Sequence, residues 1–123
     1  MPALSAARRY GEQASSVGFD WGDPGPALEK VEEEIAELKR EIAGSDKDKT
    51  ASEIGDLLFS VANVARLCDV NPELALRDAN KKFKKRFRSL EQKLMNSKIP
   101  VKSISLNEMN KIWESVKEEE SGS

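Results

Sequence analysis

Hydrophobic residues recur every three or four positions in four stretches of the chain, and no stretch alternates as a β-strand does. This spacing places apolar side chains along one side of an α-helix, so the pattern predicts an all-α protein. The stripe residues are Leu28, Val31, Ile35, Leu38 and Ile42 in 26–43; Ile54, Leu57, Leu58, Val61, Val64 and Ala65 in 50–68; Leu76, Ala79, Phe83, Phe87, Leu90 and Leu94 in 72–96; and Leu106, Met109, Ile112, Trp113 and Val116 in 105–120.

A shorter helix and a loop precede these four stretches. Residues 1–17 carry small and basic side chains and are predicted to form a helix that ends at a glycine. Residues 19–26 are rich in turn formers, which indicates a loop. This loop contains Phe19 and Trp21, which either pack against the protein or shelter a ligand.

Polar signals mark the boundaries between the later helices. Residues 45–49 are a polar connector, short enough to return an antiparallel helix. Asn71 stands before a proline, as an N-cap does, and Ser105 begins a capping box.

We expect one domain over residues 1–123, folded as an antiparallel bundle of four to five helices. Residues 1–25 would be the N-terminal helix and loop, 26–96 the helices that carry the candidate site, and 105–120 the C-terminal helix. A narrow helical core leaves apolar surface uncovered on several helices. We therefore also expect a homodimer or a dimer of dimers, that is, a homotetramer.

Two of the predicted helices each carry a pair of carboxylates spaced three residues apart. Glu34 and Glu37 lie on the first, and Glu53 and Asp56 lie on the second. Residues with this spacing are neighbours on the helix surface, one turn apart. Four oxygen ligands suit a hard cation such as Mg²⁺, whereas zinc prefers sulfur and nitrogen.

The angular positions of these carboxylates favour their convergence. On each helix the first acidic residue lies about 80° from the centre of the apolar stripe, and the second about 140° in the same direction. If the stripes face each other in an antiparallel hairpin, the acidic flanks fall on one side. The alternative is that these carboxylates only form a solvated charged face. Other glutamates in the stretch, such as Glu32 and Glu41, have no counterpart at the same angle on the second helix.

Composition excludes several classes of function. The chain has 123 residues, a net charge of −2 and no histidine, so histidine catalysis and most zinc sites are excluded and a nucleic-acid partner is not expected. Its one cysteine, Cys68, excludes an internal disulfide and fits a reducing cytoplasm. No apolar run approaches the roughly 20 residues that span a membrane, and the N-terminus lacks the apolar core of a signal peptide.

The predicted helix over 72–96 is strongly basic in part. Within 81–88 the cationic residues are Lys81, Lys82, Lys84, Lys85, Arg86 and Arg88. Such a cluster is either a solvated basic face, with nucleic acid as one conceivable contact, or a cationic wall for the phosphates of a polyphosphate substrate.

With these residues in place, the chain resembles the MazG family of nucleoside triphosphate pyrophosphohydrolases, in the all-α NTP pyrophosphatase group. The family signature Glu-Glu-x-x-Glu followed by Glu-x-x-Asp is present as Glu33-Glu34-x-x-Glu37 and Glu53-x-x-Asp56. Further matching segments are Val17 to Trp21, Gly55 to Phe59, Asn63 to Arg66, residues 71 to 77, Ala79 to Phe87, and Ile112 to Lys117. The opening and closing segments are most similar to the second domain of full-length MazG proteins.

The resemblance implies hydrolysis of an NTP or dNTP to the monophosphate and pyrophosphate, by water attack at the α-phosphorus with Mg²⁺, for which Mn²⁺ could substitute. The cellular task would be nucleotide pool control or house-cleaning. The implied metal ligands are Glu34, Glu37, Glu53 and Asp56, and Glu33 would orient or activate the water. The implied substrate contacts are Lys30, Lys49, Asn80, Lys82, Phe83, Arg86, Trp113 and Lys117.

Two other classes of function stay open at this point. One is a non-catalytic helical interaction module or a nucleic-acid-binding module that uses residues 81–88. The other is a different chemistry on the same fold, such as a dUTPase or a phosphoribosyl-ATP pyrophosphohydrolase, because the acidic cradle is shared and the base pocket differs.

Overall fold

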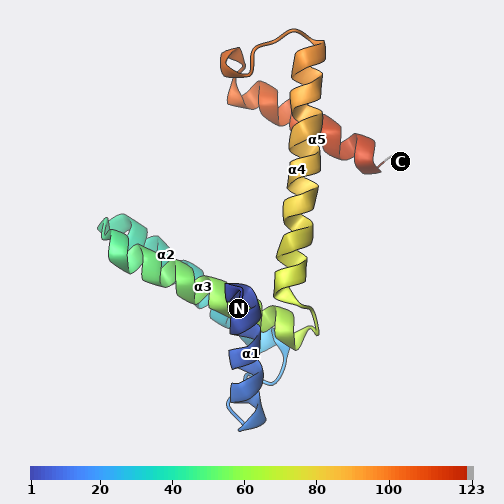
Figure 1. The fold of residues 1–123 in the computed structure, drawn as a ribbon. Helices are drawn as coiled ribbons and strands as arrows, with labels where there is room; N and C mark the ends of the chain where they lie inside the picture. Colours follow the sequence, from blue (N-terminus) through green and yellow to red (C-terminus); the bar gives the residue numbers. More distant parts are fainter. Residues whose placement is uncertain (122–123) are drawn as a thin grey trace. The chain divides into compact units, whose positions relative to one another are not determined.

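The computed structural model describes residues 1–121 as helices joined by short connections (Figure 1). No strand occurs among these residues, which confirms the predicted all-α class, and no helix among them is long and apolar enough to cross a membrane. The elements are α1 (Ala3–Ser16), α2 (Pro24–Gly44), α3 (Lys47–Leu67), α4 (Pro72–Asn96), the 3₁₀ turn η1 (Val101–Ser103) and α5 (Leu106–Ser121).

The chain forms two compact units. The first is Met1–Ala75, which contains α1, α2, α3 and the first turn of α4, and the second begins at Leu76. Each unit is described below by itself. The expectation of one domain over residues 1–123 stays a prediction.

In the first unit, α2 and α3 pack side by side as an antiparallel hairpin (Figure 1). The connection between them is only Ser45 and Asp46, shorter than the predicted five-residue connector. The prediction was wrong here because Asp46 acts as the N-cap and its side chain accepts a hydrogen bond from the Lys49 N–H at 3.1 Å, so α3 starts earlier. Ser45 makes the turn in the left-handed region, with φ 60°.

The predicted caps of the two later helices are confirmed. Oδ1 of Asn71 accepts a hydrogen bond from the Glu73 N–H at 3.0 Å at the start of α4. Oγ of Ser105 accepts one from the Glu108 N–H at 3.2 Å at the start of α5. Both satisfy backbone donors that the helix itself leaves unpaired.

Helix α1 packs against α3 at a buried glycine, Gly11. A Cβ built on Gly11 would lie 2.7 Å from Nε of Arg66 and 2.9 Å from Oδ1 of Asn63. A side chain at this position would displace Arg66 or Asn63, so Gly11 leaves room for these two side chains between the helices.

The apolar stripes of α2 and α3 are only partly covered. Ala27 and Ala62 are buried, whereas Ile35 is 39% exposed and Leu58 is 53% exposed. The two stripes therefore face each other only in part. An apolar arc as wide as these cannot be covered by one neighbouring helix. The stripe residues left exposed are Leu28, Ile35, Ile42, Ile54, Leu58 and Val61, which we call the open apolar face.

In the second unit, α4 and α5 enclose a small core of Leu90, Leu94 and Val116. Leu106, which was predicted to point inward, is 73% exposed because it stands at the first position of α5. The two helices are also joined by an ion pair between Lys93 and Glu119, at 2.6 Å.

Candidate active site

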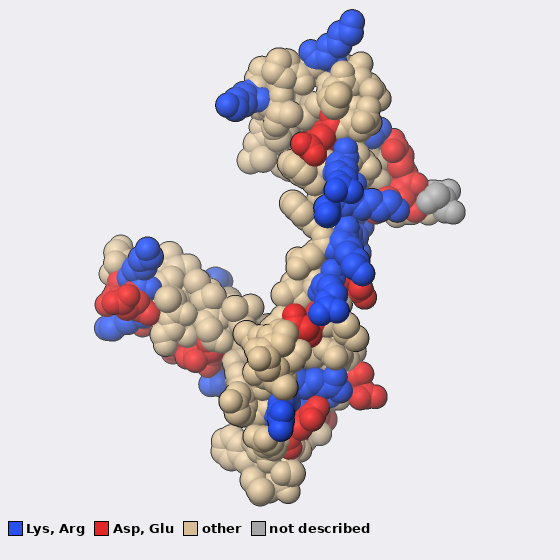
Figure 2. All heavy atoms as spheres, in the orientation of Figure 1, with Lys and Arg blue, Asp and Glu red and all other residues tan. Residues whose placement is uncertain are grey.

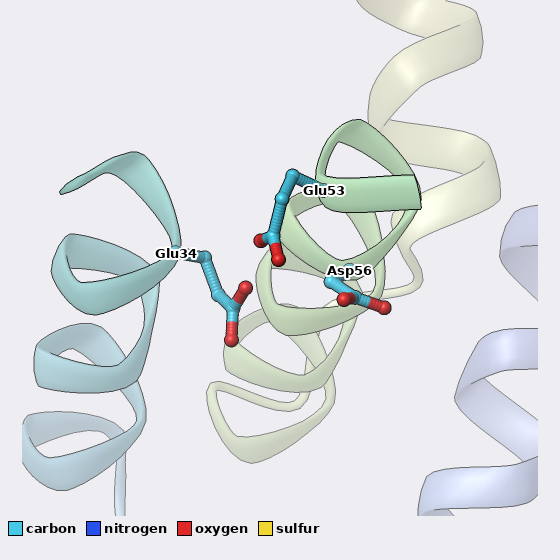
Figure 3. A group of neighbouring side chains, drawn as sticks. All are labelled: Glu34, Glu53 and Asp56. Carbon is cyan, nitrogen blue, oxygen red and sulfur yellow. The ribbon is translucent and has the colours of Figure 1, made fainter. Parts of the chain in front are cut away.

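Three carboxylates from α2 and α3 converge in the first unit. Oxygen atoms of Glu34, Glu53 and Asp56 all lie within 4.8 Å of one another. Figure 3 shows Glu34 extending from α2 toward α3, where Glu53 extends toward it and Asp56 lies one turn along the same helix. We call these three residues the acidic cluster. Their burial is graded, with Glu34 buried, Glu53 half-buried and Asp56 exposed.

A lysine stabilises the buried member of the acidic cluster. Nζ of Lys30 lies 2.9 Å from Oε1 of Glu34, one turn away on α2. This contact lowers the pKa of Glu34 below its ordinary value and raises the pKa of Lys30. Glu34, only 8% exposed, is therefore held in its charged form.

Glu53 is in the opposite electrostatic situation. The adjacent Glu34 carboxylate raises the pKa of Glu53, and burial and the charges of Asp56 and Glu37 act in the same direction. Oε2 of Glu53 is buried and has no hydrogen-bond partner among the described residues. A buried carboxylate oxygen without a partner is costly unless a cation or a proton satisfies it. The residues present therefore fit a bound divalent cation such as Mg²⁺.

The remaining predicted acidic residues lie around the acidic cluster. Glu37 pairs with Arg40 on the solvent side of α2, and the geometry therefore brings together three of the four predicted carboxylates. Its charge still acts on Glu53. Glu33 is exposed, with Oε2 at 3.7 Å from Nζ of Lys30.

The predicted substrate contacts divide between the two units. Lys30 lies beside the acidic cluster, and Lys49 is exposed in the first turn of α3. The other six lie on the α4 and α5 segments of the second unit: Asn80, Lys82, Phe83, Arg86, Trp113 and Lys117.

Within the second unit, aromatic and ionic contacts position several of these side chains. The ring of Phe83 lies 5.5 Å from that of Trp113, centroid to centroid, so Trp113 packs across the two helices. Nε of Arg86 donates a hydrogen bond to Glu120 at 2.8 Å. Lys117 lies 3.7 Å from Glu114. Asn80 and Lys82 are exposed.

Sequence reasoning missed one partly buried polar contact. The guanidinium of Arg66 on α3 donates to both carboxylate oxygens of Asp20, at 2.7 and 3.1 Å, and its Nε donates to Asn63 at 2.9 Å. Arg66 holds the pKa of Asp20 far below its ordinary value. The two partners are 46 residues apart in the chain, so no local pattern predicts the pair.

Comparison with known proteins shows which family the sequence belongs to. Residues 26–92 match the MazG nucleotide pyrophosphohydrolase domain family. The chain is 43% identical over 117 residues to the nucleoside triphosphate pyrophosphohydrolase/pyrophosphatase MazG of Thermotoga maritima, covering 95% of this chain and 45% of that protein. It is 38% identical over 122 residues to the nucleoside triphosphate pyrophosphohydrolase of Escherichia coli K12, covering 98% and 46%.

A third similarity is shorter. Over 69 residues the chain is 39% identical to the uncharacterized protein YabN of Bacillus subtilis, covering 56% of this chain and 14% of that protein. The chain thus spans about half the length of the Thermotoga and Escherichia relatives. The family match covers more than half of the chain, and the protein belongs to the MazG nucleotide pyrophosphohydrolase domain family.

Proposed function

We propose that this protein hydrolyses nucleoside triphosphates or deoxynucleoside triphosphates to the monophosphate and pyrophosphate, with Mg²⁺ as cofactor and Mn²⁺ as a substitute. The observation that carries the proposal is the acidic cluster, in which the oxygens of Glu34, Glu53 and Asp56 lie within 4.8 Å of one another. The family match and the names of the two long relatives support the reaction class.

In this proposal Glu34, Glu53 and Asp56 would hold the cation, and Glu37 would complete the set. A Mg²⁺ held there would neutralise phosphate oxygens and lower the pKa of a nearby water. Lys30 keeps Glu34 charged and in position. Glu33, which is exposed beside Lys30, orients the water that attacks the α-phosphorus and accepts its proton.

The cationic and polar residues that the family resemblance assigns to the substrate complete the proposal. Lys82 and Arg86 would bind the phosphates and stabilise the charge that develops on the pyrophosphate leaving group. Lys49 and Lys117 would add further cationic contacts, and Asn80, Phe83 and Trp113 would contact the nucleotide.

The experiment measures monophosphate and pyrophosphate release from all common NTPs and dNTPs, with Mg²⁺ and with EDTA. Glu53→Gln keeps the side-chain shape but removes a charged ligand, so we expect it to abolish metal-dependent release. Glu32→Gln, an exposed glutamate on α2 outside the acidic cluster, is the matched control and should retain activity. Release of inorganic phosphate instead of pyrophosphate would refute the proposal.

The position of water attack is tested separately with oxygen-18 water. Attack at the α-phosphorus places the label in the monophosphate. Label in pyrophosphate would mean attack at the β-phosphorus and would contradict the mechanism. A strong preference for dUTP, or for phosphoribosyl-ATP added to the substrate panel, would instead favour one of the related chemistries on this fold.

The basic row of α4 favours a second candidate function. Lys81, Lys84, Lys85 and Arg88 lie along one side of this helix, and Figure 2 shows basic side chains in a row over α4. None of the four has an ion-pair partner among residues 1–121. Such a row could bind a nucleic-acid backbone. Binding that weakens steeply with salt, in a protein without metal-dependent turnover, would favour this function.

A homodimer is part of the proposal. The open apolar face on α2 and α3 is the surface that a second copy would cover, because contiguous exposed apolar residues of this extent mark interaction sites. A dimer of dimers would extend the same association.

A further inference from the structure

The basic stretch 81–88 of α4 contains one arginine that differs from its neighbours. Arg86 is half-buried, with 23% of its side chain exposed, whereas the other cationic residues of the stretch are exposed. Arg86 alone among them has an ion-pair partner in the part of the chain that the structure describes. This partner is Glu120, to which the function proposed above assigns no role.

Glu120 stands in the last turn of α5, at the end of a run of three glutamates that begins at Glu118. The C-terminal end of a helix carries partial negative charge, so acidic side chains are unfavourable there unless cations compensate them. Helix α4 supplies two such cations, since Lys93 pairs with Glu119 and Arg86 pairs with Glu120. Figure 1 shows α5 crossing α4, and these two ion pairs join the helices.

The part of α4 that carries Arg86 is held against α5 on both sides. One turn earlier, the ring of Phe83 lies 5.5 Å from that of Trp113 on α5, and one turn later Leu90 is buried. Residues spaced by three and four lie on one side of a helix, so Arg86 belongs to the side that faces α5. An arginine in such a place buries its hydrocarbon stem and keeps its charged head at the edge of the contact.

The contact with Glu120 uses only one part of the guanidinium. Nε of Arg86 donates a hydrogen bond to Oε2 of Glu120 at 2.8 Å. The other four N–H donors of the planar group lie on its two Nη atoms. A pair of Nη atoms can bind two oxygens of one phosphate, and a carboxylate that competed with phosphate would occupy this pair. Glu120 instead fixes the plane of the group from its Nε side.

We propose that Glu120 is a positioning residue for nucleotide hydrolysis, an inference that rests on the proposed function. It holds the Arg86 guanidinium in one orientation before the nucleotide binds, with both Nη atoms available to the phosphates. Without this partner the phosphates themselves would have to order the arginine, at the cost of its rotamer entropy. Because Arg86 acts on charge that develops on the leaving group, the benefit appears in the transition state and therefore in kcat.

The kinetic test compares two adjacent glutamates that pair across the same two helices. Glu120→Ala releases Arg86 and should lower kcat for the preferred nucleotide about tenfold, with KM changed by less than about twofold. Glu119→Ala removes the ion pair to Lys93, leaves Arg86 paired, and should change neither constant. Equal losses in the two variants would mean that any weakening of the contact between α4 and α5 lowers activity, and would overturn the inference.

A double-mutant cycle separates positioning from a general loss of active protein. In the Arg86→Gln background the guanidinium that Glu120 holds is absent, so Glu120→Ala should cause no further loss of kcat. The same loss in both backgrounds would overturn the inference. A wild-type kcat in Arg86→Gln would overturn it as well, because there would then be no effect for Glu120 to support.

A spectroscopic test needs no turnover. The Nε–H signal of Arg86, assigned by its loss in Arg86→Gln, reports the motion of the guanidinium through its nitrogen-15 heteronuclear NOE. We expect a rigid signal in the wild type and in Glu119→Ala, and in Glu120→Ala a signal as mobile as that of the exposed Arg88. An equally mobile signal in the wild type would overturn the inference.

The two tests together distinguish failure of the inference from failure of the proposed function. A rigid Arg86 in a protein that hydrolyses no nucleotide would refute the proposed function, and the positioning role with it. Wild-type turnover by Glu120→Ala, in a protein that releases pyrophosphate as proposed, would refute the positioning role alone.

Discussion

The ammonium nitrogen of Lys30 lies 2.9 Å from Oε1 of Glu34, on the same face of α2 one turn earlier. Glu34 in turn lies against Glu53, whose buried Oε2 has no partner among the described residues. The lysine is the cation that the chain itself supplies to a cluster of like charges. A variant without this lysine therefore tests how far the stability of the acidic cluster depends on a nearby positive charge.

Lys30→Met should therefore destabilise the protein in EDTA. Glu34 loses its partner while it stays buried beside another carboxylate, at a cost of about 1 kcal/mol, kept small because the Lys30 side chain is 40% exposed. Added Mg²⁺ should recover most of this loss by replacing the missing charge. Urea unfolding of the wild-type and variant proteins, with EDTA and with Mg²⁺, measures the loss of unfolding free energy under each condition. An equal loss under the two conditions would contradict a cation site at Glu34.

Asp20→Asn should lower the free energy of unfolding by about 2 kcal/mol, because it leaves the nearly buried Arg66 guanidinium without its charged partner. The folded-state pKa of Asp20 is depressed, so its contribution is complete above the ordinary aspartate pKa, about pH 4, and is lost as pH falls below it.

The wild-type protein should accordingly lose stability between about pH 4 and pH 2, and the Asp20→Asn protein should lose less over the same range. Chemical unfolding at several pH values measures the two slopes. Asp78→Asn, at an exposed position on α4, is the control. If the free energy of unfolding falls with pH equally in Asp20→Asn and wild type, the Asp20–Arg66 pair contributes little to stability.

Two glycine positions should respond to alanine in opposite directions. At Gly11 the added Cβ would meet Arg66 at 2.7 Å and Asn63 at 2.9 Å, so we expect a loss of about 2 kcal/mol from overpacking. At Gly55 a Cβ would meet nothing within 4 Å, so alanine should stabilise α3 by about 0.5–1 kcal/mol. Thermal unfolding of both variants tests the pair. A destabilising Gly55→Ala would indicate a close neighbour at that point of α3.

The features that were predictable from sequence are those fixed by short-range rules. The N-caps at Asn71 and Ser105 follow from residues two or three positions away, and the helices follow from apolar spacing. The meeting of Glu34 with Glu53 was also predictable, since equal angular offsets on two antiparallel helices bring them to one side.

Other features depend on geometry that periodicity does not contain. A stripe identifies which side of a helix is apolar but not what covers it, so Ile35 and Leu58 were expected inside and are exposed. The sequence allows the Glu37 carboxylate either to join Glu53 or to pair with Arg40, three residues later on α2. In the structure it pairs with Arg40. The sequence pattern places Asp46 in the connector, because several neighbouring polar residues could equally cap the next helix. In the structure the Asp46 side chain caps α3.

The open apolar face should mediate self-association. On α3 its residues Ile54, Leu58 and Val61 are 43–53% exposed, and in water such a contiguous face is a cost that association removes. Leu58→Lys places a charge at the most exposed of these positions on α3. We expect it to weaken self-association at least tenfold, because a lysine ammonium would be desolvated in the interface.

Sedimentation equilibrium of the wild-type and variant proteins measures this effect, and circular dichroism checks that both stay helical. Val17→Lys, which adds the same charge at an exposed site outside α2 and α3, should leave association unchanged. A wild-type protein that is monomeric at micromolar concentration would contradict the assignment of this face to a second copy. If Leu58→Lys and wild type associate equally, the copies meet elsewhere, and the exposed apolar residues of α2 and α3 stay outside the interface.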